Sequence, residues 1–199
     1  MDLRLRRTLF LLILLAPYVI VSGIVISTGS EEPAGLLIRL CGLCGFIALS
    51  TGAILTILRD EIRTTLGQPF IRVHHIFVLA GLLLITLHPV LIALRFQNAA
   101  IFIPTFSSVT AFFQNGGRVA ILLVYTGFLA AVFQAALKGR WLTIHRIMYP
   151  ALILGIIHAN FVGQDLENPV IRWLCNLMAI LVIATGVMKA VQRYRRKSR

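Results

Sequence analysis

Histidine is the residue type in this chain best suited to chemistry, and all five histidines fall in two apolar stretches. His74, His75 and His88 lie in the first stretch, and His145 and His158 lie in the second. An ionisable residue within a membrane span is costly and is a functional candidate by default. Neutral imidazole is a ligand for metal ions and for haem iron. The histidines are therefore the first candidates for a cofactor or metal site.

The stretches that must position these histidines are long enough to cross a bilayer. The chain has 199 residues, of which 58% are hydrophobic and 13% are charged. A bilayer core requires about 20 apolar residues per helix, and backbone groups in lipid must be satisfied within the segment. We predict an all-α, integral membrane six-helix bundle that forms one domain over residues 1–199. The expected spans are 8–27, 35–58, 69–94, 119–137, 141–163 and 169–191, the first being retained rather than cleaved as a signal peptide.

The basic residues predict the orientation of these helices. Of the 19 Lys and Arg residues, all but Arg39, Arg95, Arg118 and Arg172 lie at the termini, in the second and fourth connections, or at their borders. Short cytoplasmic loops carry an excess of Lys and Arg. We therefore expect a multi-pass protein of the cell membrane with both termini in the cytoplasm. The net charge of +12 then reflects topology and lipid contact, and does not indicate nucleic-acid binding.

This topology predicts that the histidines form two pairs at different depths. The third and fifth spans both start in the cytoplasm, so His74 or His75 lies at the depth of His145, and His88 at the depth of His158. His74 and His88 are 14 residues apart, about 21 Å along a helix, and share a face, which favours His74 over His75 as the inner member.

The second histidine helix does not fit this geometry as simply. His145 and His158 are 13 residues apart, which does not return to one face of a straight helix. Pro150 lies between them and predicts a kink or local rewinding.

Two imidazoles facing each other in an apolar bundle are suited to bis-histidine ligation of haem. The propionates of a haem require cationic partners near the membrane surface. Arg72 and Arg146 adjoin the inner pair, Arg95, Arg118 and Arg172 are candidates at the outer pair, and Arg39 either extends to the surface or meets a propionate. Two such haems would form an electron path across the bilayer.

The histidine segments RVHHIFVLAGLLLITLHPVLIAL and WLTIHRIMYPALILGIIHANFVG resemble the ferric reductase-like transmembrane domain superfamily. This superfamily includes the membrane parts of NADPH oxidases and ferric reductases, and the haem-binding subunit of the bacterial methionine sulfoxide reductase system. The resemblance implies b-type haem, with His74 and His145 as the inner ligands and His88 and His158 as the outer ligands.

The resemblance also bears on partners. Oxidases and ferric reductases usually append a cytosolic flavin and NADPH domain, whereas this chain ends in QRYRRKSR, and no motif in it supports a flavin. The sequence thus looks more like the stand-alone sulfoxide reductase subunit, an electron-transfer component of an oxidoreductase system. The expected donor is a cytosolic flavoprotein or a quinol, and the expected recipient is an extracytoplasmic reductase or acceptor.

Two other interpretations remain open. One is a self-sufficient ferric or oxygen reductase, and the other is a transporter or structural membrane protein whose histidines are not ligands.

Two further features have ordinary explanations beside functional ones. Cys41 and Cys44 form a CxxC within the second span, where buried packing residues are expected rather than a redox pair. The connection from Arg95 to Arg118 holds five phenylalanines, and Ser107 or Ser108 is predicted to cap a short helix there. This connection is either a lipid-facing connector or a lid over a cofactor.

Overall fold

The structure is a computed structural model that describes residues 2–29 and 32–197. Every regular element within these residues is helical, so the all-α prediction is confirmed. The α-helices are α1 (Leu3–Thr28), α2 (Pro33–Ile54), α3 (Arg59–Leu66), α4 (Phe70–Phe96), α5 (Val109–Gln114), α6 (Gly116–Val132), α7 (Gln134–Leu137), α8 (Trp141–His145), α9 (Met148–Val162) and α10 (Pro169–Lys197). The 3₁₀ turns are η1 (Leu55–Ile57), η2 (Ala99–Phe102), η3 (Lys138–Arg140) and η4 (Gln164–Glu167).

Four helices are long and apolar enough to cross a membrane, namely α1, α2 continued by η1, α4 and α10. A fifth span results if α6 and the segment from Gln134 to His145 are taken together, although the two are bent by 82°. The helix α9 has 15 residues and is shorter than a full span. These helices are consistent with a multi-pass membrane protein, but the expected count of six is not confirmed.

The predicted fifth span, 141–163, is not one continuous helix. It is divided into α8 and α9 by a turn at Arg146 and Ile147. Pro150 explains the position of this turn, because its ring clashes with the carbonyl of the residue four positions earlier, which is Arg146. The chain tightens there, and Tyr149 donates to the Arg146 carbonyl at 3.1 Å. The predicted interruption by Pro150 is therefore confirmed.

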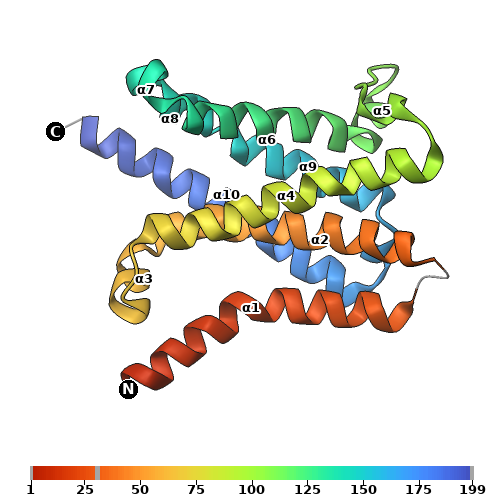
Figure 1. The fold of residues 1–199 in the computed structure, drawn as a ribbon. Helices are drawn as coiled ribbons and strands as arrows, with labels where there is room; N and C mark the ends of the chain where they lie inside the picture. The colour runs from red at the N-terminus through yellow and green to blue at the C-terminus, as the bar shows by residue number, and fades with distance from the viewer. Residues whose placement is uncertain (1, 30–31, 198–199) are drawn as a thin grey trace.

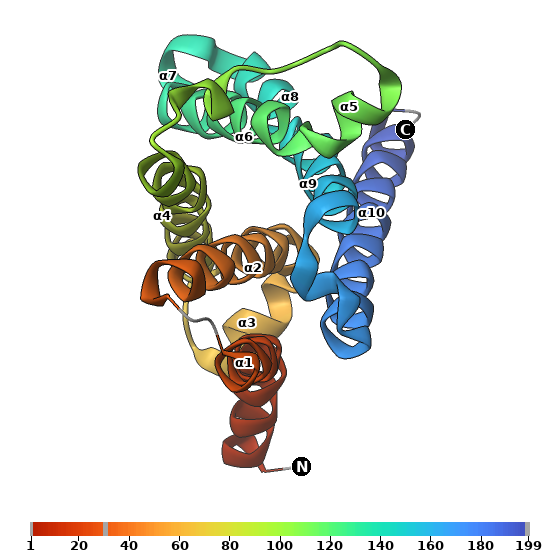
Figure 2. The same ribbon diagram turned by 90° about the vertical axis from the view of Figure 1, so that its right-hand side faces the viewer.

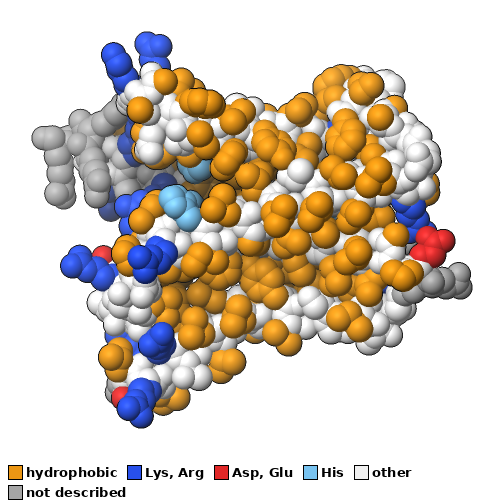
Figure 3. All heavy atoms as spheres, in the orientation of Figure 1, with side chains coloured by type: hydrophobic (Ala, Val, Ile, Leu, Met, Phe, Trp, Pro, Cys, Tyr) orange, Lys and Arg blue, Asp and Glu red, His pale blue; other side chains and the backbone are white. Residues whose placement is uncertain are grey.

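The helices lie roughly side by side, and the first and last described residues are at the same end of the molecule (Figure 1). Lys and Arg side chains gather at this end, whereas hydrophobic side chains cover the middle of the visible face (Figure 3). In the view along the helices, α2 is central and α4 lies beside it, while α6, α9 and α10 form the opposite wall (Figure 2). We call the end with the termini the inner end, and the opposite end the outer end.

The core joins α1, α2, α9 and α10. Val21, Ile47, Ile156 and Ile171, one from each of these helices, are buried in one cluster. This cluster fixes α9 and α10 to α2, and α4 packs against the same helix α2.

The connection after α4 and the cysteines follow the sequence predictions. Ser108 caps α5 and accepts from the Ala111 amide at 3.1 Å. Cys41 and Cys175 are buried and free, and Cys44 is half-buried with its Sγ 3.6 Å from the Ser22 hydroxyl.

Candidate functional site

Both candidate ligands on α4 bond to the backbone of α2. The Nδ1 atom of His74 lies 2.9 Å from the Gly52 carbonyl oxygen. The Nδ1 atom of His88 lies 2.9 Å from the Ile38 carbonyl oxygen. The two histidines are 14 residues apart, and so are the two carbonyls. The antiparallel pair α2 and α4 therefore repeats one contact at two depths.

The histidines of α8 and α9 make the same contact with the other part of the bundle. The Nδ1 atom of His145 lies 2.8 Å from the Gly127 carbonyl oxygen in α6. The Nδ1 atom of His158 lies 2.7 Å from the Gln114 carbonyl oxygen at the end of α5. Both the histidines and the carbonyls are 13 residues apart. The spacing that did not fit a straight helix thus matches the spacing of the partner carbonyls.

These four hydrogen bonds fix the chemistry of the rings. A carbonyl oxygen can only accept, so each Nδ1 must carry the proton. The Nε2 atom of a neutral imidazole is then an unprotonated lone-pair donor, ready to bind a metal. Histidines that ligate metals nearly always donate their other N–H to a carboxylate, a carbonyl or water. His75 is exposed, and its Nδ1 makes no hydrogen bond of this kind among those of the described residues.

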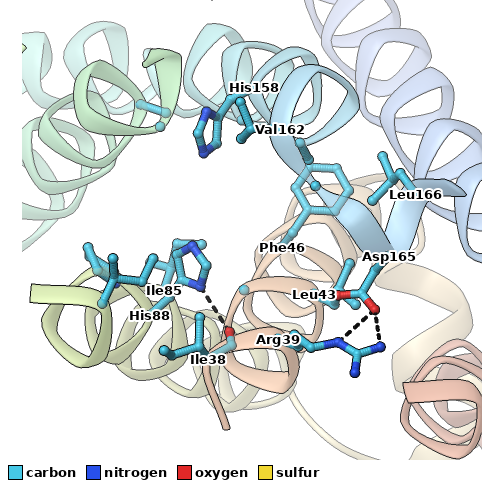
Figure 4. A pocket seen from close by; sticks show the side chains of 18 of the residues that line it. Ile38, Arg39, Leu43, Phe46, Ile85, His88, His158, Val162, Asp165 and Leu166 are labelled. Carbon is cyan, nitrogen blue, oxygen red and sulfur yellow. Dashed lines mark hydrogen bonds and ion pairs between the residues drawn. The ribbon is translucent and has the colours of Figure 1, made fainter. Parts of the chain in front are cut away.

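The outer histidines face each other across a cavity. Figure 4 shows His88 on α4 and His158 on α9 pointing into the space between their helices. This cavity has a volume of about 1040 Å³, at the upper end of the usual range for small-molecule sites. Its body is lined by apolar side chains that include Leu43, Phe46 and Ile85. The cavity therefore suits a large, mainly apolar group.

The outer part of this cavity is cationic. Arg39, Arg95 and Arg118 line it, together with Asp165. Arg118 donates to the Ile103 carbonyl at 2.7 Å, which ties the connection after α4 to the cavity wall. Arg95 is ion-paired with Glu32 at 2.9 Å and Arg39 with Asp165, so two of these three guanidinium groups already have a carboxylate partner.

Arg39 is the most extensively bonded of these cations. Its Nε donates to Asp165 at 2.9 Å, and a second donor lies 2.5 Å from the same carboxylate oxygen. The guanidinium also donates to Thr28 at 2.8 Å and to the Gly29 carbonyl. Arg39 thus ties the end of α1 and η4 to α2, which sets the outer edge of the cavity.

The inner histidines lie nearer the basic end of the bundle. Neither His74 nor His145 lines the cavity that His88 and His158 face. Aromatic rings flank the inner pair: the Phe70 ring is 5.3 Å from that of His74, and the Trp141 ring is 6.1 Å from that of His145. The outer pair thus faces one common cavity, whereas the pairing of His74 with His145 stays a prediction.

The arginines predicted to serve these pairs are placed differently. Arg172 donates to the Leu166 carbonyl at 2.6 Å and lines a small separate hollow instead of the large cavity. Arg72 is exposed and donates to Gln68 at 2.9 Å. Arg146 is half-buried in the turn between α8 and α9.

Sequence reasoning missed the backbone acceptors and Asp165. A carbonyl has no side-chain signature, so the match between the histidine spacings of 14 and 13 residues and those of the carbonyls appears only in the structure. Among the described residues there is no group of three or more His, Cys, Asp or Glu that could hold a metal ion. A haem site has a different requirement, since the porphyrin supplies four nitrogens and the protein only the axial ligands.

Comparisons of the chain with protein-family models, with curated proteins and with solved structures gave no match.

Proposed function

We propose that this chain is a b-type haem-binding, transmembrane electron-transfer subunit with one haem site at each histidine pair. The observation that carries the proposal is the fourfold hydrogen bond from Nδ1 to a backbone carbonyl. These bonds leave four Nε2 atoms unprotonated, each with a lone pair that can bind iron; they belong to His74, His88, His145 and His158. A haem bound at each pair would supply a one-electron Fe(III)/Fe(II) couple.

The cavity supports the outer site independently of the histidines. Its apolar body suits a porphyrin. Arg39 and Arg95 are paired with Asp165 and Glu32, so Arg118, whose guanidinium donates to backbone carbonyls, is the proposed partner of a propionate. Arg118 bonds the connection after α4 to the cavity wall, so this connection lies at the outer end of the proposed site. At the inner end, Arg72 and Arg146 are the proposed cationic partners, and His74 is favoured over His75.

The proposed architecture is a six-helix bundle in the cell membrane with both termini in the cytoplasm. In this arrangement α9 counts as a span together with α8, and the turn at Arg146 and Ile147 lies within it. The concentration of basic side chains at the inner end supports this orientation. A reporter enzyme that works only in the cytoplasm should therefore be active when it is inserted after Lys138 and inactive when it is inserted after Gln164. A reporter enzyme that works only outside the cytoplasm should show the opposite pattern.

Electrons would enter at the inner end from a cytosolic flavoprotein, or at either face from a quinol. They would leave at the outer end toward a reductase or a small acceptor. The chain's own contribution is to fix the ring orientations through the carbonyl bonds and to keep the ligands in an apolar setting.

The decisive measurement is the absorption spectrum of the purified protein, oxidised and then reduced with dithionite, together with the haem-to-protein ratio. We expect b-type Soret and α bands and two haems per chain. A variant carrying both His74→Ala and His88→Ala lacks one ligand in each pair and should lose both haems, which controls for adventitious binding. The absence of haem from the unaltered protein would refute the proposal, and one haem per chain would remove one pair as a site.

A further inference from the structure

Two glycines lie against the outer histidines, one on each side of the cavity. A Cβ atom added at Gly42 in α2 would lie 2.8 Å from Nδ1 and 3.0 Å from Cε1 of His88. A Cβ atom added at Gly117 in α6 would lie 2.7 Å from Cδ2 and 2.8 Å from Nε2 of His158. Real Cβ atoms essentially never make contacts below 3.0 Å. Each imidazole therefore occupies space that only glycine leaves open.

Gly42 lies one helical turn beyond the carbonyl that His88 reaches. The Ile38 carbonyl faces along α2 toward residue 42, so His88 must pass over that position to donate its Nδ1 proton. The nearest atom to the added Cβ is this same Nδ1. A side chain at position 42 would therefore push the His88 ring away from the Ile38 carbonyl. Its effect on the Nε2 edge of the ring would be smaller.

Gly117 contacts the other edge of its ring. The His158 Nδ1 donates to Gln114, three residues before Gly117, whereas the added Cβ would meet Nε2 and Cδ2. Gly116 has a similar packing role, since a Cβ there would lie 2.9 Å from Leu154, one turn before His158. The two consecutive glycines let the start of α6 approach α9 closely, and Gly117 leaves the Nε2 edge of His158 open.

We infer that Gly42 and Gly117 are positioning residues for the outer histidine pair, with different tasks. Gly42 maintains the hydrogen bond from His88 to Ile38, and Gly117 keeps the ligating nitrogen of His158 accessible. This inference rests on the proposed haem function and adds to it which neighbouring residues set the properties of the outer site.

The two tasks predict different results for alanine. Gly117→Ala blocks the ligating edge, so the haem content should fall from two to one per chain, with the inner haem retained. Gly42→Ala should retain both haems but weaken the Nδ1 hydrogen bond. A weaker bond makes the imidazole a poorer electron donor to iron, which favours Fe(II) and raises the midpoint potential of the outer haem.

The experiment measures haem content, the reduced spectrum and the two midpoint potentials for both variants and two controls. Gly23→Ala is a matched helical substitution, since no atom lies within 4 Å of its added Cβ, and should change nothing. Gly81→Ala tests general packing damage between α2 and α4, because its Cβ would lie 2.9 Å from Leu49 and touch no histidine. It should disturb both haems or lower the protein yield.

The results separate this inference from the proposed function. If the unaltered protein holds two haems and Gly117→Ala also holds two with unchanged potentials, the inference is overturned and the function stands. The same conclusion follows if Gly42→Ala leaves the outer potential unchanged or alters both potentials equally. If the unaltered protein holds no haem, the proposed function fails and this inference fails with it.

Discussion

The outer and inner histidine pairs make the same Nδ1 hydrogen bond to a carbonyl in different surroundings. The outer pair faces a cavity of about 1040 Å³, and its two histidines belong to α4, of 27 residues, and α9, of 15 residues. The inner pair uses His145 from the five-residue helix α8, next to the turn at Arg146 and Ile147. Phe70 and Trp141 flank it at the basic end of the bundle.

This comparison separates the hydrogen bond that both sites share from the surroundings that differ between them. The Nδ1 bond to a carbonyl is common to all four positions, so it is the part that the proposed function requires. The surroundings then distinguish the two sites: one faces a cavity with arginines at its edge, and the other depends on a helix junction. Because packed segments move less than junctions, the inner site should be the more adaptable of the two.

The largest expected effect is the loss of one site without the other. His158→Ala removes a ligand from the outer pair and leaves Gly127 and Gly52 bonded to the inner histidines. We expect the haem content to fall from two to one per chain and electron transfer across the membrane to be abolished. Reconstituted vesicles with dithionite outside and a trapped acceptor inside measure the transfer. Retention of two haems would show that the pairs are not separate sites.

The next comparison is within the inner pair, where His74 and His75 are adjacent. His74→Ala removes the imidazole that bonds to Gly52, so the inner haem should be lost. His75→Ala is the matched control and should keep two haems, because this side chain is exposed. The haem-to-protein ratios of the two variants show which histidine is the inner ligand. Loss of a haem in His75→Ala but not in His74→Ala would make His75 the ligand.

A smaller effect is expected at the cationic edge of the outer cavity. Arg118→Gln removes one guanidinium group there, and a hydrogen bond to a charged group is worth about 1.5–3 kcal/mol. The outer haem should therefore bind at least about tenfold more weakly. Arg172→Gln is the control, because Arg172 lines a separate hollow. Titration of the apoprotein with haem measures both, and equal weakening in the two variants would refute the assignment of Arg118.

The sequence was sufficient for the all-α class and for the boundaries of some of the long helices. The predicted third span, 69–94, differs by at most two residues at each end from α4, because hydropathy and the flanking Pro69 mark it clearly. The position along each span also predicted which arginines lie at the outer end. It could not predict from which face of its helix each arginine side chain extends. Arg172 therefore appeared equivalent to Arg118, although the structure places only Arg118 at the cavity.

The backbone features were harder to predict for a physical reason. Hydropathy averages over residues 141–163 and is insensitive to a missing amide, so Pro150 suggested an interruption without showing which way His145 turns. Ile38 and Gln114 accept the histidine hydrogen bonds through backbone carbonyls. Every residue has such a carbonyl, so the residue type does not reveal this role. Only packing in three dimensions determines which carbonyls face a histidine.

The smallest expected effect concerns the helix junction that distinguishes the inner site. Pro150→Ala restores an amide that can donate to Arg146 and favours a continuous helix. Along such a helix His145 and His158 would be rotated about 140° apart, whereas the turn now brings both to their carbonyls. The free energy of unfolding should change by no more than about 1 kcal/mol, because Pro150 lies in the first turn of α9. Electron paramagnetic resonance should show a shift of the inner haem signal alone, and an equal shift of the outer signal would mean that the two sites are not independent.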